Sequence, residues 1–413
     1  MTPAAQPAPG LLANTVRTYA WGSATAIPGL LGTDPTGEPQ AELWIGAHPS
    51  APSLLQLPEG PRPLDALIAA DPDGQLGAPV AARFGPHLPF LLKVLAADRA
   101  LSVQVHPTRA QARAGYDDED ARGIPPGADR RIYKDRNHKP EMLCALSDFD
   151  ALCGFRDPAA TAGLLDALDV DALTPWITDL RTRPAPDALR AVLTGALGSD
   201  RDRGRAAADA LALALPRAAA GGGPHGAAYA AYAAAARDYP GDPGIVAALL
   251  LNHVRLAPGQ ALHLDAGVPH AYLRGLGVEI MANSDNVLRC GLTGKHIDLD
   301  ALVGVVDFRP APAGIVEPLP AGPGEMHYPA PAEEFRLDRL DLDGTRTCDG
   351  PGPQILLCTT GEATLTCPGS RPLTLTPGAA AYLPAAAPPA VLHGSATLYR
   401  ATVPATVPAP ARP

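Results

Sequence analysis

The stretch His263–Asp298, HLDAGVPHAYLRGLGVEIMANSDNVLRCGLTGKHID, decides the fold. Turn residues at 267–269 precede a run in which Val278 and Ile280 occupy alternate positions, which is typical of a β-strand with a buried face. The turn Leu256–Gly259, LAPG, lies just upstream, and the two turns predict a β-hairpin ladder that presents His270 near a turn. A strand seldom carries many polar side chains without a function. The polar candidates in this stretch are His270, Tyr272, Glu279, Asp285, Arg289 and Lys295.

The composition favours a mainly β protein of more than one domain. A chain of 413 residues is too long for one ordinary core, and its length predicts two or three domains. The 48 prolines and 41 glycines imply many turns and therefore many short strands. We expect a first β domain at 1–153 that resumes at 254–320, a helical insertion at 154–253 and a second β domain at 321–413.

The charge and the cysteines exclude several classes of protein. A net charge of −10 argues against a surface for nucleic acids or anionic membranes, since both need an excess of basic residues. The N-terminus lacks a cationic start followed by an apolar segment, and no apolar run is long enough to cross a bilayer. The six cysteines lie singly without a C-x-x-C motif, so reduced thiols are expected. These features predict a soluble cytoplasmic protein.

Segment Leu88–His106 supplies a second group of polar side chains. Two strand-like runs are separated by Ala-Ala-Asp-Arg, which predicts a hairpin. Ser102, Gln104 and His106 stand at alternate positions, so they face the same side of the second strand. Such a polar face either lines a functional site or is the solvent-exposed face of an edge strand.

A polar loop at Tyr133–Met142, YKDRNHKPEM, leads into another apolar run. Lys139 precedes a proline and is therefore held extended, so Glu141 opens a strand and points into whatever that strand faces. Nearer the N-terminus, Glu42 and His48 lie in a segment with Trp and Gly, where packing or support of a site is the favoured interpretation.

The remaining chain is predicted to stabilise the fold. Leucines at helical spacing and an Ala-rich segment predict the helical insertion, and residues 309–314 and 317–324 are expected to form a linker. Short alternating runs after Glu334 predict a β-sandwich or barrel. Because that part has one late histidine, His393, and no cluster of possible ligands, we expect it to support the fold or a dimer contact. The Pro- and Ala-rich end, Val403–Pro413, is expected to be disordered.

Four residues form a candidate metal site. Two imidazoles, a carboxylate and an amide oxygen suit zinc, and manganese, iron or cobalt are alternatives. No H-x-H spacing strengthens this interpretation, and isolated histidines more often pack or form hydrogen bonds. The four candidates are Gln104, His106, Glu141 and His270.

Four segments closely resemble the type I phosphomannose isomerases. They are AELWIGAHPSAPS (41–53), LSVQVHP (101–107), YKDRNHKPEM (133–142) and the run at 270–298 within the stretch quoted first. The resemblance implies cupin-type jelly-roll domains with a helical insertion, and a zinc-dependent enzyme that interconverts mannose 6-phosphate and fructose 6-phosphate. It implies one zinc ion per chain, held by Gln104, His106, Glu141 and His270. The positions that match the family's pocket are Lys93, Ser102, Lys139, Tyr272, Glu279, Asp285, Arg289 and Lys295.

Such an isomerase removes a proton from the carbon beside the carbonyl. The reaction needs a base for that proton and a positive group for the enediolate that results. Zinc either polarises the carbonyl or orients side chains. Glu279 or Asp285 is expected to be the base, and Lys139 or His138 to carry the hydroxyl proton.

The substrate's phosphate needs cations in a protein of negative net charge. Arg289 offers a planar fork of donors, Lys93 or Lys295 a second charge, and Ser102 a hydrogen bond. An ion pair with Asp285, four residues earlier, is the alternative role for Arg289.

Two other functions would use the same residues. One is a cupin that binds metal and sugar phosphate as a sensor or scaffold, and the other is an iron-dependent cupin oxygenase built on His106, Glu141 and His270. A candidate base, the phosphate-binding cations and the additional Gln104 favour the isomerase. We expect a monomer or weak homodimer whose partner is a small sugar phosphate.

Overall fold

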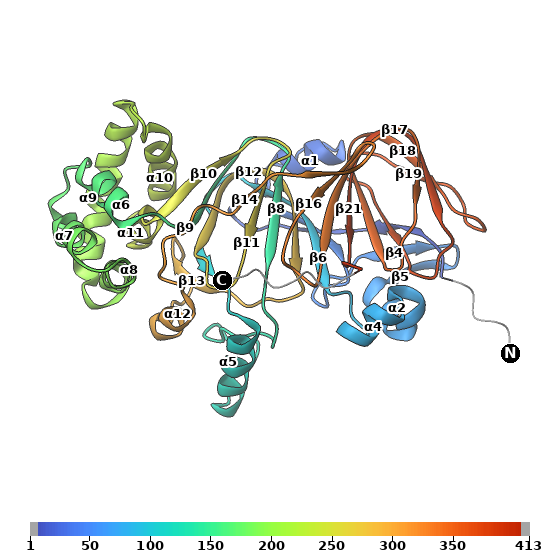
Figure 1. Cartoon of the computed structure of the whole chain (residues 1–413), viewed down its shortest axis with the longest axis horizontal. Coiled ribbons are helices and arrows are strands. Elements are labelled where there is room, and N and C mark those ends of the chain that lie inside the picture. The colour runs from blue at the N-terminus through green and yellow to red at the C-terminus, as the bar shows by residue number, and fades with distance from the viewer. Residues whose placement is uncertain (1–6, 406–413) are drawn as a thin grey trace.

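The computed structural model describes residues 7–405 of the chain. Figure 1 shows a helical lobe at one end of the molecule, joined to a β unit in the middle and a second β unit at the other end. The strands lie in antiparallel sheets, so the prediction of a mainly β fold with a helical insertion is confirmed. The predicted disorder of Val403–Pro413 falls mostly on residues outside the described range.

Strand β12 (His270–Ala282) is the centre of the first β unit. Its first half pairs with β7 (Val103–Val105) and β9 (Phe149–Phe155), and its second half with β6 (Phe90–Ala97) and β8 (Glu141–Ala145). One strand therefore belongs to both walls of this unit. The other strands of the unit are β2 (Thr15–Arg17), β3 (Glu42–Gly46), β10 (Leu251–Leu256), β11 (Ala261–Leu264), β13 (Leu288–Gly291) and β14 (Ile315–Val316).

Strand β12 bends between its halves at Gly275. Its φ of +136° is a value that L side chains rarely adopt, and an added Cβ would lie 2.5 Å from Phe149 Cδ2. The glycine lets the backbone pass close to the next strand while it changes walls.

The predicted hairpins are wrong. Strands β6 and β7 do not pair with each other but both pair with β12, while β10 pairs with β9 and β11 pairs with β8. A turn between two apolar runs looks the same in sequence whether the second run returns beside the first or crosses to the other wall. Burial across the whole unit selects the crossing here, because these strands need apolar partners on both faces.

The second β unit contains strands from both ends of the chain. Strand β1 (Gly10–Ala13) pairs with β20 (Ala380–Leu383), and β4 (Leu54–Leu57) and β5 (Gly60–Pro63) continue the sheet. The first 63 residues thus contribute to both β units, and the division at 153, 253 and 320 stays a prediction. The other strands are β15 (Leu319–Gly322), β16 (Glu325–Tyr328), β17 (Arg336–Cys348), β18 (Gln354–Thr366), β19 (Leu373–Leu375) and β21 (Ala390–Thr402). The prediction that residues 317–324 form a linker is wrong, because strand β15 lies there.

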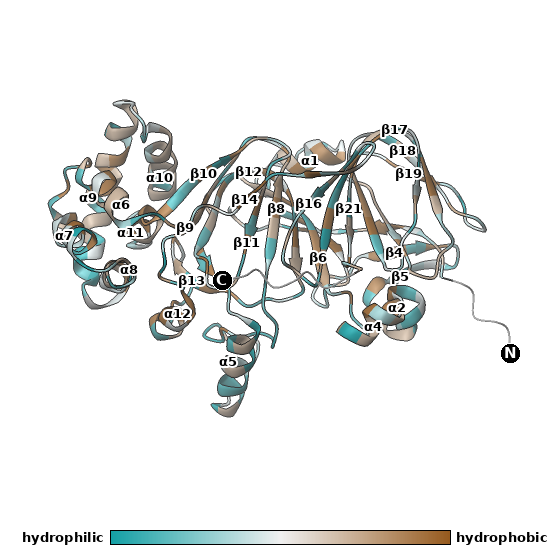
Figure 2. Ribbon diagram, viewed as in Figure 1, coloured by the Kyte–Doolittle hydropathy of each residue, from teal (hydrophilic) through white to brown (hydrophobic). Residues whose placement is uncertain are grey.

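A shared apolar core joins the two β units. Strand β6 is buried along its whole length, with Phe90, Leu92 and Val94 on one face. This face packs with Phe335 and Leu337 of the second unit and adjoining residues. The opposite face lies between the walls of the first unit, and Figure 2 shows the brown apolar segments that mark the strands of both units.

The helices attach at the edges of the sheets. The insertion's helices share one apolar core with residues of β7, β9 and β13. They are α6 (Pro158–Asp166), α7 (Thr174–Thr182), α8 (Ala185–Thr194), α9 (Arg201–Ala220), α10 (Gly226–Asp238) and α11 (Gly244–Leu249). The remaining helices are α1 (Ala26–Leu31), α2 (Leu64–Ala70), α3 (Pro72–Leu76), α4 (Ala78–Phe84), α5 (Arg109–Ala121) and α12 (Leu299–Val305). Within 7–405, none of the helices is both long and apolar enough to cross a membrane.

Replacing Gly275 by Ala is expected to destabilise the first unit, because the new Cβ would overlap Phe149 at a strained φ. We expect a loss of about 2–3 kcal/mol and a fall in Tm of roughly 2–4 °C in thermal unfolding. Gly163→Ala is the control, because that exposed helical glycine has open space around it. Its Tm should stay or rise, and an equal Tm for Gly275→Ala would contradict the role assigned to the bend.

Candidate functional site

The inner face of the first unit carries charged side chains. Along β6 and β12, alternate residues fill the shared core, so Lys93 and Glu279 point the other way, between the walls. The two residues are opposite each other in the strand register, and Glu42 follows the same alternation on β3. Glu141 occupies the matching face of β8. Alternation alone therefore gathers four ionisable side chains in one buried space.

The four predicted metal ligands lie together. His106 Nε2 is 3.3 Å and His270 Nε2 is 3.5 Å from Glu141 Oε2. The pairing of β7 with β12 sets Gln104 opposite His270, with their Nε2 atoms 3.3 Å apart. Ligand atoms of the two histidines and the carboxylate all lie within 4.8 Å of one another, which suits a single ion.

Both imidazole rings are oriented by hydrogen bonds from Nδ1 to backbone carbonyls. His106 Nδ1 donates to Asn286 O at 2.8 Å and His270 Nδ1 to Val268 O at 2.9 Å, so the Nε2 lone pairs face Glu141. Among residues 7–405, neither His106 Nε2 nor Glu141 Oε2 has a hydrogen-bond partner, although both are buried. Buried polar atoms without partners that converge in this way fit a bound cation.

The protonation states also fit a metal. Burial lowers the pKa of His106 to about 4, so its ring stays neutral. Burial opposes ionisation of Glu141, but Lys139, with its Nζ 3.0 Å from Glu141 Oε1, and His106 hold the pKa of that carboxyl well below its usual range. Neutral imidazoles and an ionised carboxylate are the forms that bind metal.

Lys93 is held between two carboxylates. Its Nζ lies 3.2 Å from Glu42 Oε1 and 3.1 Å from Glu279 Oε2, and Trp44 Nε1 donates to Glu42 Oε2 at 2.7 Å. Burial alone would lower the pKa of Lys93, but the charges of Glu42 and Glu279 raise it. Burial raises the pKa of Glu279, although the positive charge of Lys93 acts in the opposite direction. The pKa of the Tyr272 phenol is also raised, first by burial and then by the negative charge of Glu279. The supporting role predicted for Glu42 fits these contacts.

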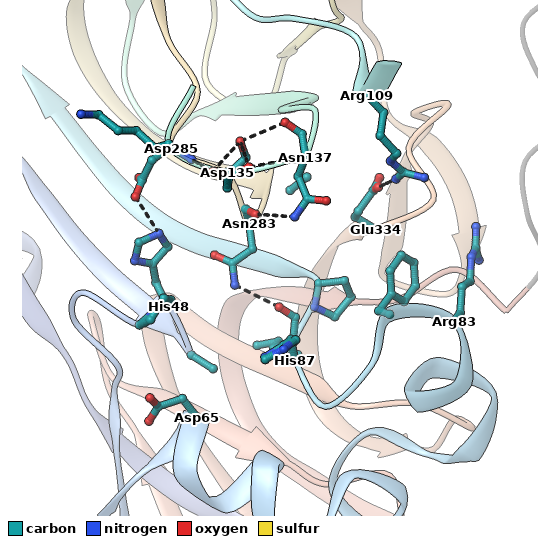
Figure 3. Close-up of a pocket in the computed structure, with 18 of the residues that line it drawn as sticks. His48, Asp65, Arg83, His87, Arg109, Asp135, Asn137, Asn283, Asp285 and Glu334 are labelled. Carbon is teal, nitrogen blue, oxygen red and sulfur yellow. Dashed lines mark hydrogen bonds and ion pairs between the residues drawn. The ribbon is translucent and has the colours of Figure 1, made fainter. Parts of the chain in front are cut away.

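A cavity of about 720 Å³ is lined by Ser284 and Asp285, which directly precede Asn286, the residue that contacts His106. Asp285, half-exposed at 53%, lies on its wall with Oδ2 3.4 Å from His48 Nε2. Figure 3 shows these two side chains facing each other, with Arg109 and Glu334 together at another side. The hydrogen bond from His48 lowers the pKa of Asp285. The alternative ion pair of Asp285 with Arg289 is not formed.

Three cations lie on one side of the site. Burial lowers the pKa of Arg289. The pKa of Lys295 is lowered mainly by burial and also by the nearby positive charges of Arg289 and Lys134. Within the described chain, Arg289 and Lys295 form no ion pair with a carboxylate. Lys134 lies on the cavity wall, whereas Arg289, Lys295 and Ser102 do not. The arrangement suits an anion that has two or more acceptor oxygens.

Asn286 joins the loop at 134–138 to the end of β12. Its Oδ1 accepts from the backbone N–H of Lys134 at 2.7 Å, and its Nδ2 donates to the carbonyls of Asp135 and Asn137, each at 2.8 Å. Its own carbonyl accepts from His106. Asn286 is fully buried and holds both the candidate ligand His106 and the loop that leads to Lys139.

The comparisons with known proteins agree with this geometry. Residues 11–158 match the catalytic domain of phosphomannose isomerase type I. The mannose-6-phosphate isomerase of Escherichia coli is 40% identical over 394 residues, covering 94% of this chain and 98% of that protein. This chain belongs to the type I phosphomannose isomerases. The Schizosaccharomyces pombe mannose-6-phosphate isomerase is 32% identical over 364 residues, covering 82% of this chain and 84% of that protein.

Solved phosphomannose isomerases share the whole fold. A zinc-bound mannose 6-phosphate isomerase has a TM-score of 0.88 at 37% identity and covers 96% of this chain and 100% of its own. A phosphomannose isomerase variant from Salmonella typhimurium has a TM-score of 0.89 at the same identity and coverage. The cupin-type fold class predicted from the sequence is confirmed.

Several residues of this phosphomannose isomerase site were missed in the sequence. Asn286 and Lys134 lie inside the quoted segments, and their place beside candidate ligands is the signal that could have found them. Glu333 and Glu334 also lie on the cavity wall, which corrects the expectation that the second β unit carries no polar cluster near the site. No local pattern marks these two glutamates.

Replacing Glu42 by Gln should destabilise the protein by about 3 kcal/mol, because buried Lys93 loses one of its two charged partners. Thermal unfolding with matched metal content measures the change. Asp118→Asn removes an exposed i,i+4 pair with Arg122 and should cost less than about 0.5 kcal/mol. Equal effects of the two substitutions would contradict the importance of the buried pair.

Proposed function

We propose that this chain is a zinc-dependent mannose-6-phosphate isomerase that interconverts mannose 6-phosphate and fructose 6-phosphate. The observation that carries the proposal is the buried group of His106, Glu141 and His270, whose ligand atoms converge and in which His106 Nε2 and Glu141 Oε2 have no hydrogen-bond partner among the described residues. Gln104, whose side chain lies next to His270, would complete the set of ligands through its amide oxygen. When bound, zinc would supply positive charge for oxygen atoms of the substrate.

The general base is assigned by which carboxylate has access to the cavity. Asp285 lies on the cavity wall and Glu279 does not, because Glu279 is turned inward to Lys93. A base must reach the carbon-bound proton before its pKa matters, so we assign this role to Asp285 and the support of Lys93 to Glu279. Lys139, paired with Glu141, and His138, beside the cavity residue Asn137, remain the candidates that move the hydroxyl proton.

The phosphate would bind to the three cations. Arg289 and Lys295 lack carboxylate partners in the described chain, and Lys134 adds a third charge at the cavity. A dianion placed among them would offset their mutual repulsion. Ser102 and Tyr272 stay proposed substrate contacts, and the buried hydroxyl of Tyr272 has no hydrogen-bond partner within the described residues.

The proposed setting is the cytoplasm, with a sugar phosphate as partner and no nucleic acid or membrane. All six cysteines are buried free thiols, which suits a reducing compartment. A monomer or weak homodimer stays our proposal for the assembly.

Isomerisation of mannose 6-phosphate is expected to depend on zinc. A strong chelator should abolish formation of fructose 6-phosphate in a coupled assay, and added zinc should restore it. Full activity of protein shown to be metal-free would refute the proposed role of zinc.

His270→Ala tests the ligand assignment directly, because it removes one imidazole and leaves a weak amide in the set. We expect zinc affinity to fall by more than about 100-fold in chelator competition. His393→Ala, at the exposed end of the second β unit, is the control and should retain stoichiometric zinc. Stoichiometric zinc in His270→Ala would remove His270 from the ligands.

Arg289→Ala should lower kcat/KM roughly 100-fold, because a charge-assisted hydrogen bond to the substrate is lost, while zinc content stays intact. Arg289→Lys keeps the charge but not the fork and should lose less. Steady-state kinetics then assign the residue: a rise in KM indicates a phosphate anchor, and a fall in kcat indicates stabilisation of the enediolate. Wild-type constants in Arg289→Ala would exclude it from the site.

A further inference from the structure

Glu334 connects the second β unit to both segments that flank predicted zinc ligands. It lies two residues before β17, and its side chain is buried at 6% exposure. One oxygen, Oε1, contacts both His138 Nε2, at 2.7 Å, and Arg109 Nη2. Arg109 follows the ligand His106 by three residues, and His138 precedes the ligand Glu141 by three.

The contact with Glu334 fixes the tautomer of His138. A carboxylate only accepts hydrogen bonds, so the short distance requires a hydrogen on His138 Nε2. Arg109 Nη2 lies 2.9 Å from the same nitrogen and could donate only to an unprotonated Nε2, but the shorter contact of 2.7 Å with a carboxylate oxygen, which cannot donate, selects Nε2–H. His138 is thus held with Nε2–H toward Glu334, and its Nδ1 is left to accept or carry a proton.

The cluster is not a second metal site. His138, Glu333 and Glu334 are close enough to hold an ion, but both carboxylates already pair with arginines. Glu333 contacts Arg83 and Arg109, and Arg109 also occupies the space between Glu334 and the histidine. A cation there would meet a fixed guanidinium at hydrogen-bond distance, which opposes binding.

The position of Glu334 is rigid. Its neighbour Phe335 and, two residues further, Leu337 are buried in the core shared by the two β units. Glu334 also lies on the cavity wall together with Arg109. Figure 3 shows the two side chains in contact at the edge of the cavity.

We infer that Glu334 is a positioning residue of the isomerase reaction, which holds His138 in the Nε2–H tautomer for proton transfer beside the cavity. The inference rests on the proposed function, because His138 matters only if a sugar hydroxyl proton is moved there. The second β unit then contributes to the chemistry through one carboxylate, which acts through His138.

Glu334→Gln keeps the size of the side chain but removes its charge. We expect kcat to fall about 10-fold, with KM for mannose 6-phosphate and zinc content unchanged within twofold. In a His138→Gln background the same substitution should change kcat by less than about twofold, because the residue through which Glu334 acts is already gone. Additive losses in this cycle, or an unchanged kcat in Glu334→Gln, would overturn the inference.

Asp338→Asn is the matched control. Asp338 is a fully buried carboxylate that also accepts from a histidine, His327 Nδ1 at 2.9 Å, and an arginine, Arg400 Nη2 at 2.8 Å, but inside the second β unit. The Asp338→Asn substitution should lower Tm and leave kcat within twofold of wild type. An equal fall of kcat in Asp338→Asn would show that any damage to this unit has the same effect, and would also overturn the inference.

A spectroscopic measurement separates this inference from the proposed function. In ¹⁵N-edited NMR of the zinc-loaded protein, the His138 ring should show one Nε2–H tautomer, and Glu334→Ala should abolish that preference. An unchanged tautomer in the variant would refute the inference even in an active enzyme. If the wild type does not convert mannose 6-phosphate, the proposed function fails, while the ring nitrogen signals still decide whether Glu334 fixes the tautomer.

Discussion

The site depends on one strand that serves two walls. Because β12 pairs with β7 and β9 before Gly275 and with β6 and β8 after it, ligands from opposite walls meet across a short distance. His270 lies at the start of this strand, and Glu279 faces Lys93 near its end. A straight strand would keep all of its partners in one sheet. The close approach of backbone at a residue without Cβ is therefore the constraint from which the geometry of the metal-binding group follows.

Charge balance in the buried space explains why it suits a divalent cation. Glu42, Glu141 and Glu279 face Lys93 and Lys139 there, so three carboxylates meet two ammonium groups and one negative charge remains. An uncompensated buried charge is costly, and the neutral imidazole of His106 does not offset it. A divalent cation would change the net charge of this space from −1 to +1 and would satisfy the ligand atoms that lack partners.

Sequence reasoning found the candidate ligands, which the fold brings together, because their signal is local, and it failed where pairing is long-range. Alternation placed Gln104 and His106 on one face, and the proline after Lys139 placed Glu141 at a strand start. The hairpins were wrong because two adjacent runs carry no information about which third strand buries them better. Glu334 could not be found at all, since it is 196 residues from His138 and no periodic pattern surrounds it. The comparisons support the family, but the contact itself comes only from the folded chain.

The two β units cannot be regarded as a catalytic part and a passive support. The same apolar core that holds Phe335 also receives Phe90, Leu92 and Val94 from β6, whose other face carries Lys93. Packing that joins the units therefore sets the position of a buried charge on one side and of Glu334 on the other. Strands β1, β4 and β5 add to this, since the N-terminal residues cross into the second sheet before β6 is reached. Separating the units would expose this core on both sides, so the wall of the cavity and the stability of the fold are products of one interface.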